Sequence, residues 1–223
     1  MSDSTRYAVI SGATAAPAVN RVLRNTYMLL AVTLAFSALA AGLGMALNLG
    51  RGASLGASLG ALALVWFVLP RTANSAAGLG VVFGITGLLG LGLGPLLNAY
   101  LSLKNGPELV MTACGGTALI CGGLSLYAIT TRKDFSFLGG FLLTGMLVVL
   151  GASVANLFFA VPALSLAISA AVILIMSGFI LFDTGRIVNG GETNYILATV
   201  SLYLSIYNIF VSLLQLLGMS SDD

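Results

Sequence analysis

The sequence predicts an all-α membrane protein, a bundle of seven transmembrane helices with the seventh helix central. The first observation is composition, since 58% of the 223 residues are hydrophobic and only 7% are charged, whereas soluble domains carry about 25% charged residues. The second is that apolar runs of about 20 residues, the length that crosses a hydrocarbon core, recur seven times. A β-barrel would need segments of about ten residues that alternate in polarity, and runs such as residues 170–182 do not alternate.

The seven predicted spans follow one another with short connections. They cover residues 27–49, 53–70, 78–101, 109–130, 135–157, 161–182 and 195–217. They divide the chain into a polar N-terminal tail (residues 1–24), a transmembrane domain (residues 25–218) and a short C-terminal tail (residues 219–223). The N-terminal tail lacks hydrophobic periodicity, so we expect it to be a mobile cytoplasmic segment.

The positive charges predict the orientation, because loops that stay in the cytoplasm retain Lys and Arg. Seven cations fall on the side of the amino terminus, namely Arg6, Arg21, Arg24, Arg71, Arg132, Lys133 and Arg186. Only Arg51 and Lys104 fall on the other side. The sequence therefore predicts a multi-pass protein with its amino terminus in the cytoplasm and its carboxyl terminus outside.

Several classes of function are unlikely from the residue inventory. The chain has no histidine, the commonest general base and transition-metal ligand, and no phosphate-binding loop or metal-ligand cluster stands out. We therefore expect no catalytic residues, no bound metal and no resident cofactor. The net charge of +2 predicts no nucleic-acid partner. Cys114 and Cys121 lie seven residues apart on one helix face, about 10 Å along its axis, which exceeds disulfide reach, so they are interpreted as packing residues.

Glycines line one flank of the third predicted span. Gly80, Gly84, Gly87, Gly90 and Gly94 recur at spacings of three and four. Small residues at such spacing let helix backbones approach closely in lipid. The pattern predicts a tight helix contact, with a flexible gate near the carboxyl end of the span as the alternative.

A polar stripe runs along the seventh predicted span. Ser201, Ser205, Asn208, Ser212 and Gln215 follow spacings of four, three, four and three. Lipid penalises unsatisfied polar groups, so this face must meet other helices or water. The stripe therefore predicts an enclosed seventh helix and leaves two interpretations open, interhelical hydrogen bonds or the lining of a polar path.

Asp183 is the acidic residue at the edge of a span, and ionisable groups in this position are candidates for function. It is either a pH sensor within the bundle, or a solvated side chain, or the partner of Arg186 in an i,i+3 ion pair. Glu192 follows in a glycine turn, where we expect its charge to be solvated.

Four motifs carry a resemblance to a known family. They are Leu23-Arg24-Asn25-Thr26-Tyr27, Thr131-Arg132-Lys133-Asp134 leading to Ser136-Phe137-Leu138-Gly139-Gly140, Gly190-Gly191-Glu192-Thr193-Asn194-Tyr195, and Leu202-Tyr203-Leu204-Ser205-Ile206-Tyr207-Asn208-Ile209-Phe210. In this order they resemble the Bax inhibitor-1 family, specifically its bacterial YccA-type branch of inner-membrane proteins. The resemblance implies a seven-helix bundle with the last helix central, and Arg132, Lys133 and Asp134 as a cytoplasmic loop motif.

The resemblance implies two functions. Proteins of the YccA-type branch are similar to modulators and slow substrates of the membrane-anchored ATP-dependent protease FtsH, which grips a cytoplasmic tail, here residues 1–24. Members of the wider family resemble pH-regulated calcium leak channels with two paired aspartates. That reading makes Ca²⁺ the transported ion and places Asp183, Ser201, Ser205, Asn208 and Ser212 on the path.

The sequence departs from the channel members of the family at one position. Asp183 matches the family's first aspartate, but Ser205 stands where the second is expected, and a serine supplies no second charge. Ser205 is also expected about 16 Å beyond Asn194 along its helix, whereas Asp183 lies near the cytoplasmic edge. Either the sixth span reaches further than predicted or the two side chains do not touch. The oligomeric state is left open by the sequence.

Overall fold

A computed structural model describes residues 3–220 of the chain, with side chains for residues 19–219. The described residues form α-helices, one π-helical turn and connections, without a strand. The elements are α1 (Asp3–Ala46), α2 (Arg51–Ala63), the π-helical η1 (Leu64–Val68), α3 (Leu69–Thr72), α4 (Ala77–Leu101), α5 (Gly106–Thr131), α6 (Leu138–Phe159), α7 (Pro162–Val188) and α8 (Tyr195–Ser220). Seven helical stretches in the described part of the chain are long and apolar enough to cross a membrane, which confirms the predicted fold class.

Two helices extend well beyond the predicted spans. α1 begins at Asp3, so the predicted tail is helical from this residue onwards, although the side chains of residues 1–18 lie outside the described set. α7 continues to Val188, six residues beyond the predicted end of its span.

The second span consists of three consecutive segments, α2, η1 and α3. Pro70 in α3 lacks a backbone N–H, and its ring clashes with the carbonyl four residues earlier in a regular helix. The chain relieves this clash with the π-helical turn just before it, in which the N–H of Leu69 donates to the carbonyl of Leu64. The span therefore continues as helix to Thr72.

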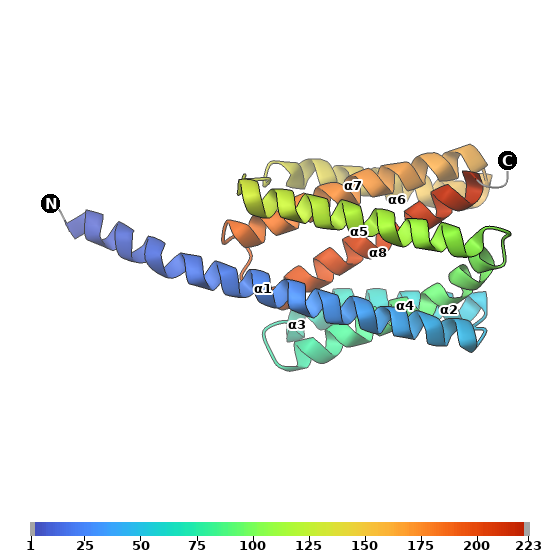
Figure 1. Cartoon of the computed structure of the whole chain (residues 1–223), viewed down its shortest axis with the longest axis horizontal. Helices are drawn as coiled ribbons and strands as arrows, with labels where there is room; N and C mark the ends of the chain where they lie inside the picture. Colours follow the sequence, from blue (N-terminus) through green and yellow to red (C-terminus); the bar gives the residue numbers. More distant parts are fainter. Residues whose placement is uncertain (1–2, 221–223) are drawn as a thin grey trace.

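Helix α8 crosses the middle of the bundle (Figure 1) and packs against α1, α4, α5 and α7. Leu202, Ile209 and Leu214 on α8 are fully buried. Tyr203, which is 1% exposed, shares a hydrogen bond of 2.6 Å with the hydroxyl of Ser37 on α1. The expected central position of the last helix is confirmed.

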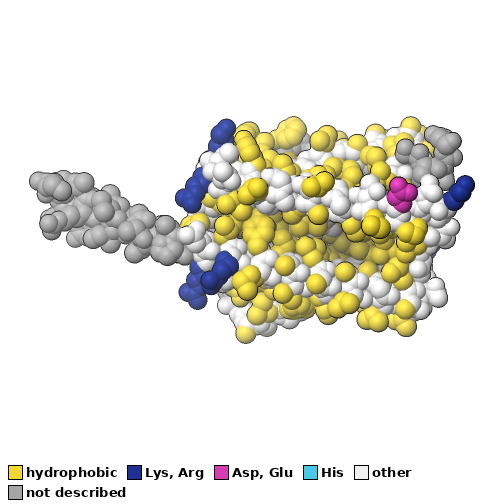
Figure 2. Space-filling view, viewed as in Figure 1, with side chains coloured by type: hydrophobic (Ala, Val, Ile, Leu, Met, Phe, Trp, Pro, Cys, Tyr) yellow, Lys and Arg dark blue, Asp and Glu magenta, His cyan; other side chains and the backbone are white. Residues whose placement is uncertain are grey.

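The cations gather at one end of the bundle (Figure 2). This cation-rich end carries the connections from α3 to α4, from α5 to α6 and from α7 to α8, together with the part of α1 that holds Arg21 and Arg24. The amino-terminal part of α1 projects beyond the other helices at the same end (Figure 1). Two of the four sequence motifs also form connections at this end, and they position the candidate site.

Candidate functional site at the cation-rich end

The glycine motif between α7 and α8 forms the turn that ends α7. Gly190 has a φ of +77°, in the left-handed region that glycine adopts without strain. The N–H groups of Gly191 and Glu192 both donate to the carbonyl of Arg186, at 2.8 and 3.1 Å. The turn thus satisfies a carbonyl at the helix end and brings Glu192 back alongside α7.

Asn194 starts α8 and ties it to a neighbouring connection. Its Oδ1 accepts the N–H groups of Ile196 at 2.9 Å and Leu197 at 3.2 Å, the geometry of an N-cap. Its Nδ2 donates to the carbonyl of Ala73 at 3.0 Å and to Oδ1 of Asn74 at 2.8 Å. One side chain therefore links the start of α8 to the connection between α3 and α4.

The predicted loop motif forms the connection between α5 and α6. Arg132 ends α5 with a φ of 50°, and Oδ1 of Asp134 accepts the hydroxyl of Ser136 and its N–H. These two hydrogen bonds hold the pKa of Asp134 below its ordinary value. Asn189 Nδ2 donates to the carbonyl of Lys133 at 3.2 Å, so this connection is joined to the end of α7.

Asp183 lies inside α7, five residues before the helix ends. Its side chain is 9% exposed, and Oδ2 accepts a hydrogen bond from the hydroxyl of Ser201 on α8. The interpretation of Asp183 as a solvated interfacial charge is therefore wrong. A cavity of about 160 Å³ adjoins the pair and is lined by Asp183, Arg186, Glu192, Leu197, Ala198 and Ser201.

Arg186 pairs with Glu192 and not with Asp183. Its Nη2 lies 3.4 Å from Oε2 of Glu192, and its guanidinium carbon lies 5.6 Å from the ring centroid of Phe182. An i,i+3 ion pair between Arg186 and Asp183, one of the alternatives, is not among the described salt bridges. Glu192 is 19% exposed rather than solvated, and its Oε1 accepts the N–H of Asn194 at 2.9 Å.

The polar stripe of α8 meets Asp183 at Ser201 rather than at Ser205. The hydroxyl of Ser205 donates to the carbonyl of Ser201 at 3.2 Å, and Nδ2 of Asn208 donates to the carbonyl of Leu204 at 2.8 Å. These two bonds lie within α8, whereas the described hydrogen bond of Ser201 joins α8 to α7. Ser205, Asn208 and Ser212 line neither this cavity nor the larger apolar one between α1 and α5.

A second polar contact joins α1 to the same end of α7. The hydroxyls of Tyr27 and Thr184 lie 3.0 Å apart, and the hydroxyl of Thr199 on α8 lies 3.3 Å from the carbonyl of Thr26. The motif in α1 therefore contacts both helices that hold the Asp183 site.

Two groups at this end were missed by sequence reasoning. The first is the place of Glu192, whose charge was expected to be solvated but which lines the cavity together with Asp183 as a second carboxylate. The second is the pair of Tyr27 and Thr184, which no spacing along the chain connects. The site comprises Asp183, Ser201, Arg186 and Glu192, two carboxylates and one guanidinium beside a small cavity, which can hold or exchange a proton or a cation.

The chain is similar to known proteins over nearly its whole length. Residues 19–222 match the family described as "Inhibitor of apoptosis-promoting Bax1". The chain is 54% identical over 204 residues, 92% of each chain, to the "Modulator of FtsH protease YccA" of Escherichia coli strain K12. It is equally similar to the "Inner membrane protein YccA" of Escherichia coli O6:H1, and 47% identical, again over 92% of each chain, to an uncharacterized membrane protein of Vibrio cholerae.

Proposed function

The chain belongs to the Bax inhibitor-1 family, and on this premise we propose that it is a non-enzymatic modulator and slow substrate of the membrane protease FtsH. The observation that carries the proposal is the 54% identity, over 92% of both chains, with a protein named as a modulator of this protease. In this role the chain occupies the protease and thereby restrains its degradation of other membrane proteins.

The fold supports this role at two places. The amino-terminal part of α1 projects from the cation-rich end (Figure 1), where a protease in the same membrane can reach it. The positive charges at this end favour a cytoplasmic location, so we place the amino terminus in the cytoplasm and the carboxyl terminus outside. α1 then packs along most of α4, so a protease that pulls on the amino terminus must first separate these two helices.

Deletion of residues 2–18 is expected to lengthen the half-life of the protein several-fold in cells with active FtsH. This deletion removes most of the proposed handle, residues 1–24, and ends before Arg21, Arg24 and the first predicted apolar run. The measurement is a chase of the protein after synthesis stops, repeated in cells depleted of FtsH, where both forms should persist equally.

Deletion of residues 221–223 serves as the matched control, because the proposed orientation places this end outside and away from the protease. It should leave the half-life unchanged. The handle proposal fails if the protein lacking residues 2–18 disappears as fast as the full chain while FtsH is active.

A second candidate function, a calcium leak, is favoured by one observation. Asp183 and Glu192 place two carboxylates beside one cavity, and oxygen ligands of this kind suit Ca²⁺. On this proposal Ca²⁺ binds at the Asp183 site on its way through the bundle.

Calcium flux into liposomes containing the purified protein tests the leak. Asp183→Asn keeps an acceptor for Ser201 but removes the charge, so it should change the flux several-fold. Glu108→Gln, an exposed acid in the first turn of α5 at the opposite end, should not. Flux no greater than that of empty liposomes would rule the leak out.

A further inference from the structure

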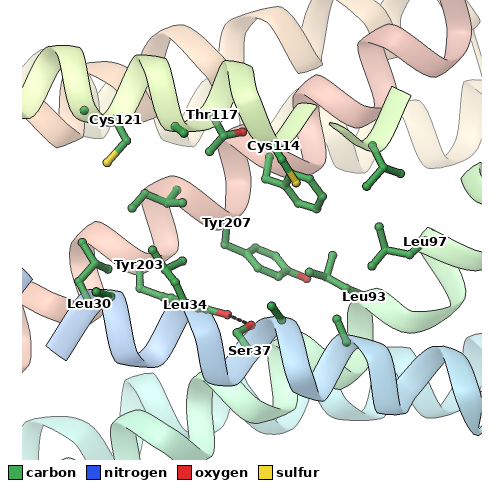
Figure 3. A pocket seen from close by; sticks show the side chains of 18 of the residues that line it. Leu30, Leu34, Ser37, Leu93, Leu97, Cys114, Thr117, Cys121, Tyr203 and Tyr207 are labelled. Carbon is green, nitrogen blue, oxygen red and sulfur yellow. Dashed lines mark hydrogen bonds between the residues drawn. The ribbon is translucent and has the colours of Figure 1, made fainter. Parts of the chain in front are cut away.

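A second, larger cavity opens on the face of the bundle between α1 and α5. Its volume is about 600 Å³, and the space-filling view shows a hollow with hydrophobic side chains on this face (Figure 2). α8 forms its floor and α4 closes one end (Figure 3). We call this cavity the lateral crevice.

The walls of the lateral crevice follow helical spacing. On α1 they are formed by Tyr27, Leu30, Ala31, Leu34, Ser37, Ala38, Ala41 and Met45, and on α5 by Val110, Cys114, Thr117, Ala118, Cys121, Gly122 and Ser125. Four of these residues are both exposed and small, namely Ala31, Ala38, Ala118 and Gly122. They form the mouth, which opens sideways into the hydrocarbon region because the lining runs along the middle of both spans.

The length and volume of the crevice limit what can bind in it. From Tyr27 to Met45 the α1 wall covers eighteen residue steps, about 27 Å at 1.5 Å per residue. A helix of this length, about 10 Å across, would occupy roughly 2,000 Å³, well above the cavity volume of about 600 Å³, whereas a single polymethylene chain, whose carbons pack about 4 Å from their neighbours, is far thinner.

The side chains that line the crevice favour a hydrocarbon occupant over water. The hydroxyls of Ser37 and Tyr203 bond to each other, and the hydroxyl of Thr117 donates to the carbonyl of Ala113 in its own helix at 2.7 Å. These paired hydroxyls leave the hydroxyl of Ser125, unpartnered among the described residues, as an isolated polar group, whereas a buried water needs two to four polar partners. Tyr207 adds its ring to the floor (Figure 3).

We propose that the lateral crevice binds one acyl chain of a bilayer phospholipid, which enters sideways between α1 and α5. The chain lies on Tyr207 and passes Leu93 and Cys114, and it supplies the packing that α1 and α5 do not give each other along the mouth. Neither the protease nor a calcium leak is needed for this binding, so the proposal stands apart from both.

Photocrosslinking tests the proposal. The purified full chain is placed in phosphatidylcholine vesicles that contain a fraction of phospholipid with a diazirine midway along one acyl chain. After irradiation, labelled peptides are mapped by mass spectrometry. We expect labels on Tyr207, Leu93 and Cys114, inside the crevice, as well as on lipid-facing side chains such as Trp66.

A substitution that fills the mouth of the crevice gives a variant that can be compared with a control at the neighbouring position. Ala118→Phe at the mouth should reduce labelling of Tyr207 and Leu93 by about tenfold, equivalent to a loss of about 1.4 kcal/mol, while Trp66 labelling stays constant. Leu119→Phe, at the next position, which is 78% exposed and outside the lining, should change neither. Unchanged thermal unfolding of both variants shows that the bundle is intact.

Three results would overturn the proposal. The first is labelling of Trp66 without labelling of Tyr207, and the second is crevice labelling that Ala118→Phe leaves intact. The third comes from a separate arm with diazirine-labelled free fatty acid in unlabelled vesicles. If only this arm labels the crevice, the occupant is a free fatty acid and not a phospholipid chain.

Discussion

Replacement of Tyr203 by Ala is expected to lower the free energy of unfolding by about 3 kcal/mol, the lower end of the range for truncation of a buried aromatic side chain. The lower end applies because lipid is as apolar as a protein core, so transfer from water adds little here. Tyr203 packs in the centre of the bundle, with its hydroxyl 2.6 Å from Ser37 on α1 and 3.4 Å from the carbonyl of Thr86 on α4. The loss is measured by unfolding the protein in mixed micelles.

Two variants separate the packing of Tyr203 from its hydrogen bonds. Tyr203→Phe keeps the ring and should cost about 1 kcal/mol, the usual net value of one hydrogen bond. Phe158→Ala truncates an aromatic side chain that is 82% exposed on α6 and should leave stability unchanged. Equal losses at positions 203 and 158 would contradict the central position of α8.

Replacement of Gly94 by Leu is expected to destabilise the protein by about 2 to 3 kcal/mol, the cost of overpacking a well-packed contact. A Cβ atom at Gly94 would lie 2.4 Å from the carbonyl carbon of Gly44 and 2.7 Å from the nitrogen of Met45. Both atoms belong to the backbone of α1, so they move only if α1 and α4 separate. Backbone contact between small residues is a main source of helix association in lipid.

Gly80 is the control on the same helix. A Cβ atom there has no neighbour within 4 Å, so Gly80→Leu should be neutral or stabilise the helix by up to about 1 kcal/mol through its higher helix propensity. Both variants are compared by unfolding in mixed micelles. If Gly94→Leu is as stable as Gly80→Leu, then α1 and α4 do not meet in the protein as the structure places them.

The glycine pattern was only partly interpretable from the sequence. The stripe correctly predicted a tight contact, because Gly87, Gly90 and Gly94 face Phe36, Ser37 and Gly44 on α1. The same spacing extended to Gly80, which faces open space, and to Gly84, which faces Leu64. Spacing identifies a helix face but not where along that face the neighbouring helix lies.

The spans were predictable for a simple physical reason. Lipid demands about 20 consecutive apolar residues and satisfied backbone groups, so hydropathy marks each crossing. It marks the apolar segment and not the helix, however, which explains the error at α7. The helix continues past Asp183 to Val188, and this extension buries the carboxylate and brings it to Ser201.

The lateral crevice left no signal in the sequence. It arises where small side chains, such as Ala38 and Ala118, face each other across two helices that are not consecutive in the chain. Each of these residues is ordinary on a lipid-facing helix. The chain's two cysteines, Cys114 and Cys121, were interpreted as packing residues, yet both line the crevice.

On the proposed function, this chain restrains FtsH by occupying it through its amino terminus. The most direct measurement uses purified FtsH and ATP in proteoliposomes and follows degradation of a second membrane-protein substrate. We expect the full chain to slow this degradation, and the chain lacking residues 2–18 to have no effect. Degradation that proceeds at the same rate with and without the full chain, or that the shortened chain slows equally, would contradict the claim.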